Sequence, residues 1–194
     1  MTTTELKLPD ATLHYCPGFL DAEEADQVMQ ALLQQVNWRQ DRIRLFGREH
    51  LIPRLQAFHS DPGIHYTYSG LRLAGAPWLP VLLPIKARLE AICEQPFNAL
   101  LLNLYRDGQD AMGWHADNEP ELGRNPVIAS VSLGATRRFR LRHNDSRDTH
   151  SLGLEHGSLL LMSGPTQHHW QHCLPRSKRC HAPRINLTFR LISV

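Results

Sequence analysis

The residues of this chain best suited to chemistry begin with a histidine and an aspartate, His115 and Asp117, in the stretch GWHADNEP. Alternate side chains of an extended backbone point the same way, so an imidazole and a carboxylate two residues apart can reach one ion. A single H-x-D pair is weak evidence for a metal site, and a second stretch with possible ligands strengthens that evidence. That stretch is HHWQHC, which holds His168, His169 and His172.

Two histidines and one carboxylate are the ligands of non-haem Fe(II) oxygenases, a set that leaves coordination positions open. Residue spacing does not decide which of the three downstream histidines would complete it. Zinc is the alternative metal, because Cys173, Cys180 and His181 lie close by in the sequence. However, C-x6-C followed directly by histidine lacks the paired short spacings of a structural zinc site.

A second group of polar residues lies on one face of the predicted strand RINLTFRL, residues 184–191. Its apolar face comprises Ile185, Leu187, Phe189 and Leu191. Its polar face comprises Arg184, Asn186, Thr188 and Arg190. One interpretation of the polar face is a solvated surface. The other is a pocket wall, and two inward-facing arginines then need an anionic partner because an uncompensated buried charge is costly.

A dicarboxylate would supply that partner and would also suit an open iron site, which needs an electron-donating cosubstrate. 2-Oxoglutarate chelates iron with its keto acid end, and its distant carboxylate needs the rigid cationic fork that arginine provides. In the stretch NLYRDG, Asn103 and Tyr105 alternate onto one strand face and add an amide and a phenol. Each residue also has a purely structural interpretation, because Tyr105 fits a core position and Asn103 fits a turn.

The elements that must position these residues begin with a short strand over 11–15 and an amphipathic helix. Asp21 and Glu24 have the spacing of a capping box, which marks the start of that helix. A second helix is expected over 81–95. Its buried residues are predicted to be Ile85, Leu89 and Ile92.

From residue 99 onward the pattern changes to short strands separated by turn signals. The strands are expected over 99–105, 127–133, 137–143, 150–156, 156–163 and 184–192. Two helices followed by six or more strands predict an α+β, mainly β fold. We expect an antiparallel sandwich or jelly roll with the N-terminal helices packed on one sheet, and a single domain over residues 1–194.

The composition, with 42% hydrophobic and 21% charged residues, is typical of a soluble globular protein. A net charge of +2 permits a nucleic-acid partner without requiring one. No apolar run approaches the ~20 residues of a membrane span, and the first ten residues lack the apolar core of a signal peptide. We therefore expect a cytoplasmic protein without a membrane partner, whose four cysteines are thiols.

Taken together, these motifs resemble the AlkB-type Fe(II)/2-oxoglutarate-dependent nucleic-acid dealkylases. The stretches N-L-Y-x7-G-W-H-A-D, W-Q-H and P-R-I-N-L-T-F-R occur in that order, and YTYSG, SVSLGAT and HGSLLLM match as well. The resemblance implies a double-stranded β-helix, or jelly roll. It also implies that His115, Asp117 and His172 bind iron.

The same resemblance implies the surroundings of 2-oxoglutarate. They would comprise Asn103, Tyr105, Arg184, Asn186, Thr188 and Arg190. Arg184 would hold the far carboxylate together with Tyr105. Arg190 would hold the carboxylate near iron together with Asn103.

For the substrate, the resemblance is closest to the human member of the family that acts on duplex DNA, and it implies a recognition segment over about 42–70. The implied substrate-binding residues are Phe46, Gly47, Arg48, Tyr66, Thr67, Tyr68, Glu119, Arg176, Lys178 and Arg179. Phe46 would fill the gap left by a flipped base, and the basic loop PRSKRCHAPR would grip the opposite strand. The flank GWH is instead similar to a member that prefers single strands.

The implied activity is DNA repair by oxidative demethylation of N1-methyladenine and N3-methylcytosine. Fe(II) is the cofactor, and 2-oxoglutarate and O2 are consumed while succinate, CO2 and formaldehyde are released. The alternatives are the same chemistry on RNA or on a protein, and a non-enzymatic, zinc-stabilised β-sandwich that binds nucleic acid. We expect a monomer that acts on alkylated DNA, with RNA as the alternative partner.

Overall fold

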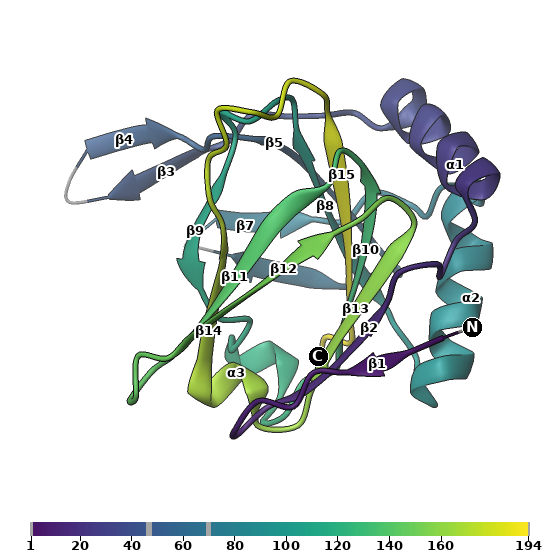
Figure 1. The fold of residues 1–194 in the computed structure, drawn as a ribbon. Coiled ribbons are helices and arrows are strands. Elements are labelled where there is room, and N and C mark those ends of the chain that lie inside the picture. The colour runs from purple at the N-terminus through teal and green to yellow at the C-terminus, as the bar shows by residue number, and fades with distance from the viewer. Residues whose placement is uncertain (1, 46–47, 69–70, 194) are drawn as a thin grey trace.

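The computed structural model describes residues 2–45, 48–68 and 71–193, and for residues 43–45, 48, 66–68 and 71–73 it describes the backbone alone. Within this part of the chain, two antiparallel sheets face each other and two helices lie on the outside of the larger one (Figure 1). This is the mainly β arrangement that the order of the predicted elements indicates.

The larger sheet has seven strands among the described residues. In spatial order they are β1 (Thr4–Glu5), β2 (Thr12–Cys16), β13 (Ser158–Ser163), β10 (Ile128–Gly134), β15 (Arg184–Arg190), β8 (Ala99–Tyr105) and β5 (Leu55–Ser60). The strand with the two arginines, β15, therefore lies inside the sheet, between β10 and β8.

The smaller sheet has four strands in the described part of the chain. In spatial order they are β12 (Thr149–Leu154), β11 (Arg137–His143), β14 (Trp170–Leu174) and β9 (Met112–His115). Two further strand pairs are β3 (Arg42–Leu45) with β4 (Arg48–Leu51), and β6 (His65–Tyr68) with β7 (Leu71–Ala74). The β3–β4 pair extends away from the two sheets (Figure 1).

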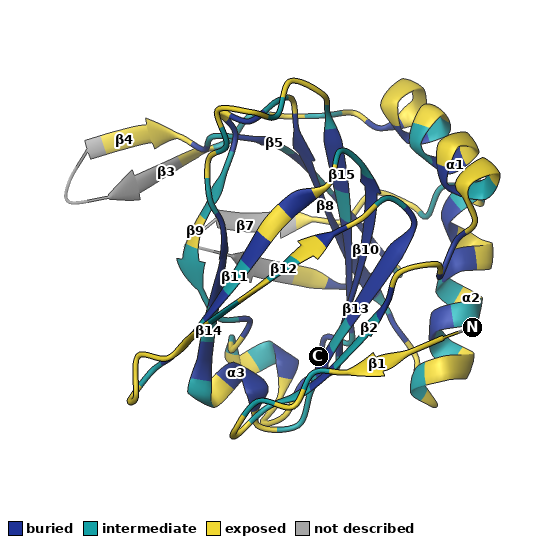
Figure 2. Cartoon of the chain, in the orientation of Figure 1, coloured by how far each residue is buried: buried dark blue, intermediate teal, exposed yellow. Residues whose placement is uncertain are grey.

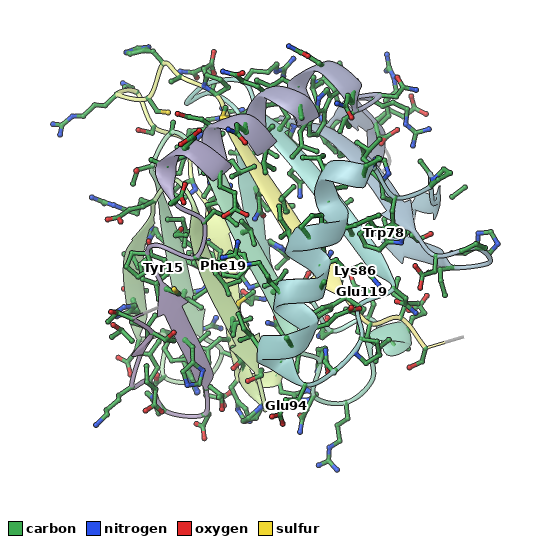
Figure 3. The ribbon with its side chains drawn as sticks, turned by 90° about the vertical axis from the view of Figure 1, so that its right-hand side faces the viewer. Tyr15, Phe19, Trp78, Lys86, Glu94 and Glu119 are labelled. Atoms are coloured by element: carbon green, nitrogen blue, oxygen red, sulfur yellow. The ribbon has the colours of Figure 1, made fainter. Side chains whose placement is uncertain are left out.

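Helix α1 (Ala22–Gln35) begins where the sequence predicts, because the Asp21 carboxylate accepts a hydrogen bond from the Glu24 amide at 2.9 Å. Helix α2 (Leu83–Cys93) follows the 3-10 turn η1 (Pro80–Leu82) and ends at Glu94, whose backbone is left-handed with φ 51°. Both helices lie across the outer face of the larger sheet, with the Lys86 ammonium 5.4 Å from the ring centre of Trp78 (Figure 3). Two short helical pieces complete the chain, η2 (Pro120–Leu122) and α3 (Thr166–His169).

One hydrophobic core lies between the helices and the larger sheet. Ile185, Leu187 and Phe189 of β15 are fully buried there, together with Leu32 of α1 and Leu89 of α2. The predicted burial of this strand face against the helices is confirmed. Strand β15 is buried along most of its length (Figure 2). Leu191, expected on the same face, comes after the strand has ended at Arg190.

A second core fills the space between the two sheets. It combines Leu101 and Met162 of the larger sheet with Phe139, Leu141 and Trp170 of the smaller one. The space between the sheets is therefore apolar on this side, so any charge that enters it must be compensated.

One predicted burial is wrong. Ile92 is 43% exposed, whereas Ile85 and Leu89 are buried as expected. Cys93, four residues after Leu89, continues the buried stripe instead and packs against the core. Periodicity alone does not decide which of Ile92 and Cys93 is buried, because residues three and four positions after Leu89 both lie near the same side of a helix.

The sequence pattern also missed strands β5, β9 and β14 as separate elements. In β14 Trp170, His172, Cys173 and Leu174 are all buried, so the stretch WQHCL lacks the two-residue alternation that would have predicted a strand. No helix of the described residues is long and apolar enough to cross a membrane.

Candidate metal centre and cosubstrate pocket

Adjacent strands of the smaller sheet bring the predicted ligands together. His115 ends β9, and it lies opposite His172 in the antiparallel pairing of β9 with β14. The two imidazole rings are 4.2 Å apart between their centres. With Asp117, two residues beyond the strand, they form a group whose ligand atoms all lie within 4.8 Å of one another.

Burial of the two histidines and the charge of Arg190 together set the protonation of this group in the form that a metal requires. Burial lowers the pKa of His172 to about 3 and lowers the pKa of His115. Burial alone would raise the pKa of Asp117, but the Arg190 charge, helped by the two histidines, outweighs it and brings the pKa to about 2. At neutral pH the group therefore offers two neutral imidazoles and one ionised carboxylate.

Neighbouring side chains hold the Asp117 carboxylate and backbone. The Arg190 guanidinium donates to Asp117 Oδ1 at 2.9 Å, and both side chains are buried. The Asp117 backbone N–H donates to Gln167 Oε1 at 2.9 Å. Sequence reasoning did not anticipate either contact, because each joins segments far apart in the chain.

The donor set fits Fe(II), because two imidazoles and one carboxylate on adjoining segments leave room for further ligands on the ion. One cavity connects this group to the predicted cosubstrate residues. Its polar lining comprises Asn103, Tyr105, His115, Asp117, Ser130, His172, Arg184, Asn186, Thr188 and Arg190. The structure thus brings the H-x-D pair and the polar face of β15 to the same cavity.

Arg184 occupies the other end of β15 and is 2% exposed. It donates to the Ser132 hydroxyl at 2.9 Å, and its guanidinium carbon lies 5.4 Å from the ring centre of Tyr105. Burial lowers its pKa to about 10, so the group stays cationic at neutral pH. Its Nε is buried and makes no hydrogen bond to any described residue, so this end of the cavity fits an anionic ligand such as a carboxylate.

The remaining polar groups of the cavity form local hydrogen bonds. Asn186 donates to the Ser130 hydroxyl at 2.8 Å and accepts from Thr188 at 3.2 Å. Asn103 accepts from the Nε of Arg54 at 2.8 Å. Arg54 is buried, and the sequence analysis did not identify it. Because Arg54 donates to the oxygen of the Asn103 side-chain amide, it fixes the direction in which the NH2 group of that amide points.

Of the three histidines left open by spacing, only His172 joins the H-x-D pair within the described residues. His168 is exposed and contacts the Arg124 carbonyl, and His169 ends α3 in a different cluster. Among residues 2–45, 48–68 and 71–193, the structure forms no metal-binding group from Cys173, Cys180 and His181. The zinc site that these two cysteines and His181 would form is therefore absent from this part of the chain.

The predicted substrate residues are described in part. Phe46 and Gly47 lie outside the described residues, and so do the side chains of Arg48, Tyr66, Thr67 and Tyr68, whose backbones lie in β4 and β6. Glu119 precedes η2 and is half-buried.

The basic loop between β14 and β15 carries Arg176, Lys178 and Arg179 on the surface. Arg176 Nε donates to the Gln109 carbonyl at 3.0 Å. Gly108 packs so closely on this loop that a Cβ there would lie 1.8 Å from the Ser177 carbonyl oxygen. The turn before β9 and the basic loop are therefore held together next to the cavity.

Comparison with known proteins agrees with this geometry. Residues 12–190 match the family model of the 2OG-Fe(II) oxygenase superfamily. This chain belongs to that superfamily. Its members' cofactor chemistry, with Fe(II), 2-oxoglutarate and O2, is the chemistry that the donor set and the buried Arg184 fit.

Within the superfamily, the chain is similar to proteins named as AlkB homologues. It is 46% identical over 180 residues to the human protein named DNA oxidative demethylase ALKBH2, covering 87% of this chain and 69% of that one. It is 47% identical to the bovine protein of the same name, of which it spans 65%. The human alkB homolog 3 is 42% identical over 189 residues, and this chain spans 64% of it.

Solved structures confirm the jelly roll. The chain superposes on "The structure of OsALKBH1" with a TM-score of 0.65 at 18% identity, over 96% of this chain and 99% of that one. A Pseudomonas putida prolyl-4-hydroxylase gives a TM-score of 0.63 at 15% identity, over 94% and 92%. The predicted double-stranded β-helix with helices on one sheet is therefore the fold of this oxygenase.

Proposed function

We propose that this oxygenase is a DNA repair enzyme that oxidatively demethylates N1-methyladenine and N3-methylcytosine. The observation that carries the proposal is the single cavity in which His115, Asp117 and His172 share a lining with Arg184 and Arg190. The names of the relatives, DNA oxidative demethylase ALKBH2 among them, support DNA as the substrate.

In this proposal His115, Asp117 and His172 hold Fe(II), which when bound supplies the activation of O2 that the oxidation requires. Arg190 keeps Asp117 ionised and oriented through the 2.9 Å hydrogen bond between them. The apolar side chains of Leu101, Phe139 and other residues of the second core exclude water from the cavity.

The cosubstrate 2-oxoglutarate would lie along β15. Its far carboxylate would contact Arg184 and Tyr105, since the Nε of Arg184 is a buried donor without a hydrogen bond to any described residue and the guanidinium lies beside the Tyr105 ring. The keto acid end would lie toward Asn103 and Arg190, with Asn186 and Thr188 lining the length between them. In this orientation the two ends of 2-oxoglutarate lie near the two arginines of β15, Arg184 and Arg190.

The reaction consumes one O2 and one 2-oxoglutarate for each methyl group. One oxygen atom enters succinate as CO2 leaves, and the other converts the N-methyl group to N-hydroxymethyl. Release of formaldehyde and of the hydroxyl proton then restores the neutral base. The methylated bases are cationic, and we propose that the Glu119 carboxylate favours them electrostatically.

The base must leave the helix, because its alkylated edge is inaccessible in a duplex, and flipping costs a few kcal/mol. We propose that segment 42–70 performs this recognition, through Phe46, Gly47, Arg48, Tyr66, Thr67 and Tyr68. The projection of β3–β4 from the two sheets supports a role outside the jelly roll (Figure 1). Arg176, Lys178 and Arg179 would hold phosphates, so binding weakens as salt rises.

We further propose that residues 1–194 act as one dioxygenase domain, as a monomer in the cytoplasm. The four cysteines are free in the structure, which supports a reducing compartment. Methylated RNA is the alternative substrate to compare with methylated DNA, because the flank GWH is similar to that of a family member that prefers single strands.

The test is turnover of single-stranded and duplex DNA that carries one N1-methyladenine, with Fe(II) and 2-oxoglutarate present. We expect formaldehyde and succinate in equal amounts, and little of either from N6-methyladenine, whose ring is uncharged. Matched RNA strands in the same assay compare the two nucleic acids. Absence of formaldehyde from every methylated strand would defeat the substrate assignment.

A second measurement addresses the predicted finger. Phe46→Ala should reduce repair of a duplex several-fold more than repair of a single strand, because only a duplex leaves a gap in the base stack. The ratio of the two rates is the readout, and Leu51→Ala, at an exposed position on the same strand pair, is the control. Equal losses on both substrates would remove the finger role.

A further inference from the structure

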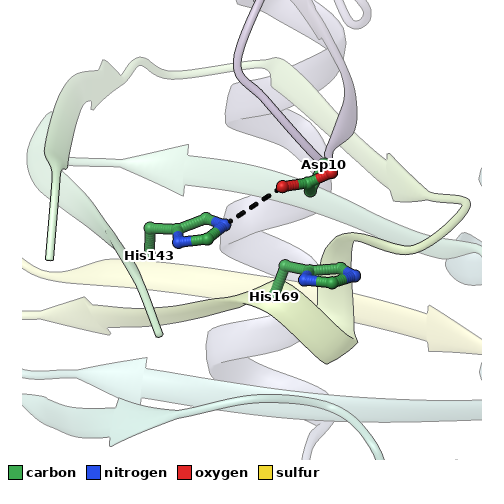
Figure 4. A group of neighbouring side chains, drawn as sticks. All are labelled: Asp10, His143 and His169. Carbon is green, nitrogen blue, oxygen red and sulfur yellow. Dashed lines mark ion pairs between the residues drawn. The ribbon is translucent and has the colours of Figure 1, made fainter. Parts of the chain in front are cut away.

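A second group of metal-binding side chains lies outside the cavity. Asp10, His143 and His169 offer one carboxylate and two imidazoles whose ligand atoms all lie within 4.8 Å of one another. The His143 and His169 rings stack at 6.0 Å with 14° between their planes, and both lie beside the Asp10 carboxylate (Figure 4). None of these residues lines the cavity of the proposed active site.

The buried histidine of this group has one nitrogen that makes no hydrogen bond to the described residues. His143 is 6% exposed, and its Nε2 forms no hydrogen bond with any described residue. That atom points at the Asp10 carboxylate, 3.4 Å away, beyond the length of a good hydrogen bond (Figure 4). A buried nitrogen that makes no good hydrogen bond is costly, and an ion between it and Asp10 would replace this long contact with a ligand bond.

The three residues come from segments far apart in the chain, and each segment is fixed close to the group. Asp10 lies in the loop between β1 and β2, where the Pro9 carbonyl accepts a hydrogen bond from the Trp170 indole at 2.8 Å. His143 ends β11. His169 ends α3, and its carbonyl accepts a hydrogen bond from the backbone N–H of Asn144 at 2.7 Å.

We propose that Asp10, His143 and His169 form a second metal site, which binds a divalent transition-metal ion of the zinc class. Two imidazoles with one carboxylate suit zinc better than calcium or magnesium, which prefer sets of oxygen ligands. Water would complete a tetrahedron, because the Asp10 carboxylate is 56% exposed and reaches solvent. The role is structural: the ion joins the β1–β2 loop to the residue directly before β14.

Binding of a metal ion at this second site would change the hydrogen bonds of His143. Its Nδ1 accepts from the backbone N–H groups of Asp145 at 3.3 Å and Ser146 at 3.2 Å. A metal on Nε2 requires the proton of the neutral ring to sit on Nδ1, so both of these long contacts must be given up. The two amides therefore report directly on metal binding by His143.

The first experiment counts zinc in a background that lacks the proposed iron site. In the full chain carrying His115→Ala and Asp117→Ala, we expect one zinc ion per chain to remain after gel filtration. Adding His169→Gln should remove it. Adding His168→Gln, the exposed neighbour outside the group, should leave it in place.

The second experiment uses zinc titration of the wild-type chain, followed by the backbone amide resonances of Asp145 and Ser146. We expect both resonances to shift with the zinc that stays bound and to stay unchanged in Asp10→Asn. Asparagine tolerates the left-handed backbone of residue 10, with φ 54°, so this variant keeps the loop while it weakens a ligand. Zinc should also raise the unfolding temperature of the wild type more than that of Asp10→Asn.

Retention of zinc in the variant that also carries His169→Gln would overturn the proposal. So would a background variant that binds no zinc, or zinc binding that leaves the Asp145 and Ser146 resonances in place. In each of these cases the contact of His143 with the Asp10 carboxylate would only join the N-terminal loop to the sheet.

Discussion

Arg184 and Arg190 lie at the two ends of β15, on the same face and both buried, yet their charges are compensated in different ways. Arg190 forms an ion pair with the buried Asp117 at 2.9 Å. Arg184 contacts a serine hydroxyl and an aromatic ring, and it forms no ion pair with any carboxylate of the described residues.

The difference indicates two kinds of buried arginine. One is balanced by an acid of the same chain and helps to keep a metal ligand ionised. The other remains uncompensated by the protein, and the low-dielectric surroundings that lower its pKa also strengthen its attraction for an anion. A carboxylate ligand at that end would complete the compensation, so the contrast between the two ends is what suits the cavity to 2-oxoglutarate.

The largest expected effect comes from removing the acid of the compensated end. Asp117→Ala takes away a proposed iron ligand, and 2-oxoglutarate decarboxylation should fall to background while the fold persists. Succinate production and the far-ultraviolet circular dichroism spectrum check the two statements. The control is His168→Gln, an exposed histidine outside the group, which should keep its turnover; normal turnover of Asp117→Ala would remove the ligand assignment.

The contrast predicts opposite effects on stability when each arginine is made apolar. Arg190→Met leaves Asp117 charged, buried and unpaired, so the free energy of unfolding should fall by about 3–5 kcal/mol. Arg184→Met removes an uncompensated buried charge and should be neutral or mildly stabilising. Urea unfolding without iron or 2-oxoglutarate measures both, and equal losses in the two variants would contradict the distinction.

Arg184→Lys tests the geometry of the uncompensated end. Lysine keeps the charge but loses the planar fork, so the concentration of 2-oxoglutarate at half-maximal rate should rise about tenfold, or about 1.4 kcal/mol. Arg138→Lys, at an exposed position of β11, is the matched control and should leave this concentration unchanged. An unaltered requirement in Arg184→Lys would restore the alternative that this strand face only fills the sheet.

The smallest effect concerns the ion pair of Arg106 and Asp110, which lies in the turn between β8 and β9 and outside the residues that line the cavity. Burial alone would raise the pKa of Asp110, but hydrogen bonds and charge from Arg106 outweigh it and lower the pKa below 3.8. A folded-state pKa below the unfolded value stabilises the protein above about pH 4, and this stabilisation is lost as pH falls further. Asp110→Asn should therefore cost about 1 kcal/mol at pH 7, and the cost should shrink at pH 3.

Urea unfolding at the two pH values measures this cost, with the exposed Glu155→Gln as the control. A cost that is the same at both pH values would mean that Asp110 acts through its hydrogen bonds alone and not through its charge. The buried Asp117–Arg190 pair would then be the only one of the two ion pairs in which charge compensation contributes to stability.

Local patterns in the sequence determined a large part of this protein. The two-residue alternation in RINLTFRL separates the face buried against the helices from the face that lines the cavity, and both assignments hold in the structure. The H-x-D spacing likewise identifies two of the three side chains of the metal-binding group. These features are local because neighbouring residues of an extended chain have fixed relative directions.

Tertiary structure decided which distant groups meet. The choice of His172 over His168 and His169 follows from the pairing of β9 with β14, and only His172 faces His115 in that register. The Asp117–Arg190 pair, the Arg54–Asn103 hydrogen bond and the Asp10 group also join segments from different parts of the chain. Such contacts depend on strand register and sheet packing, which periodicity along one segment does not contain.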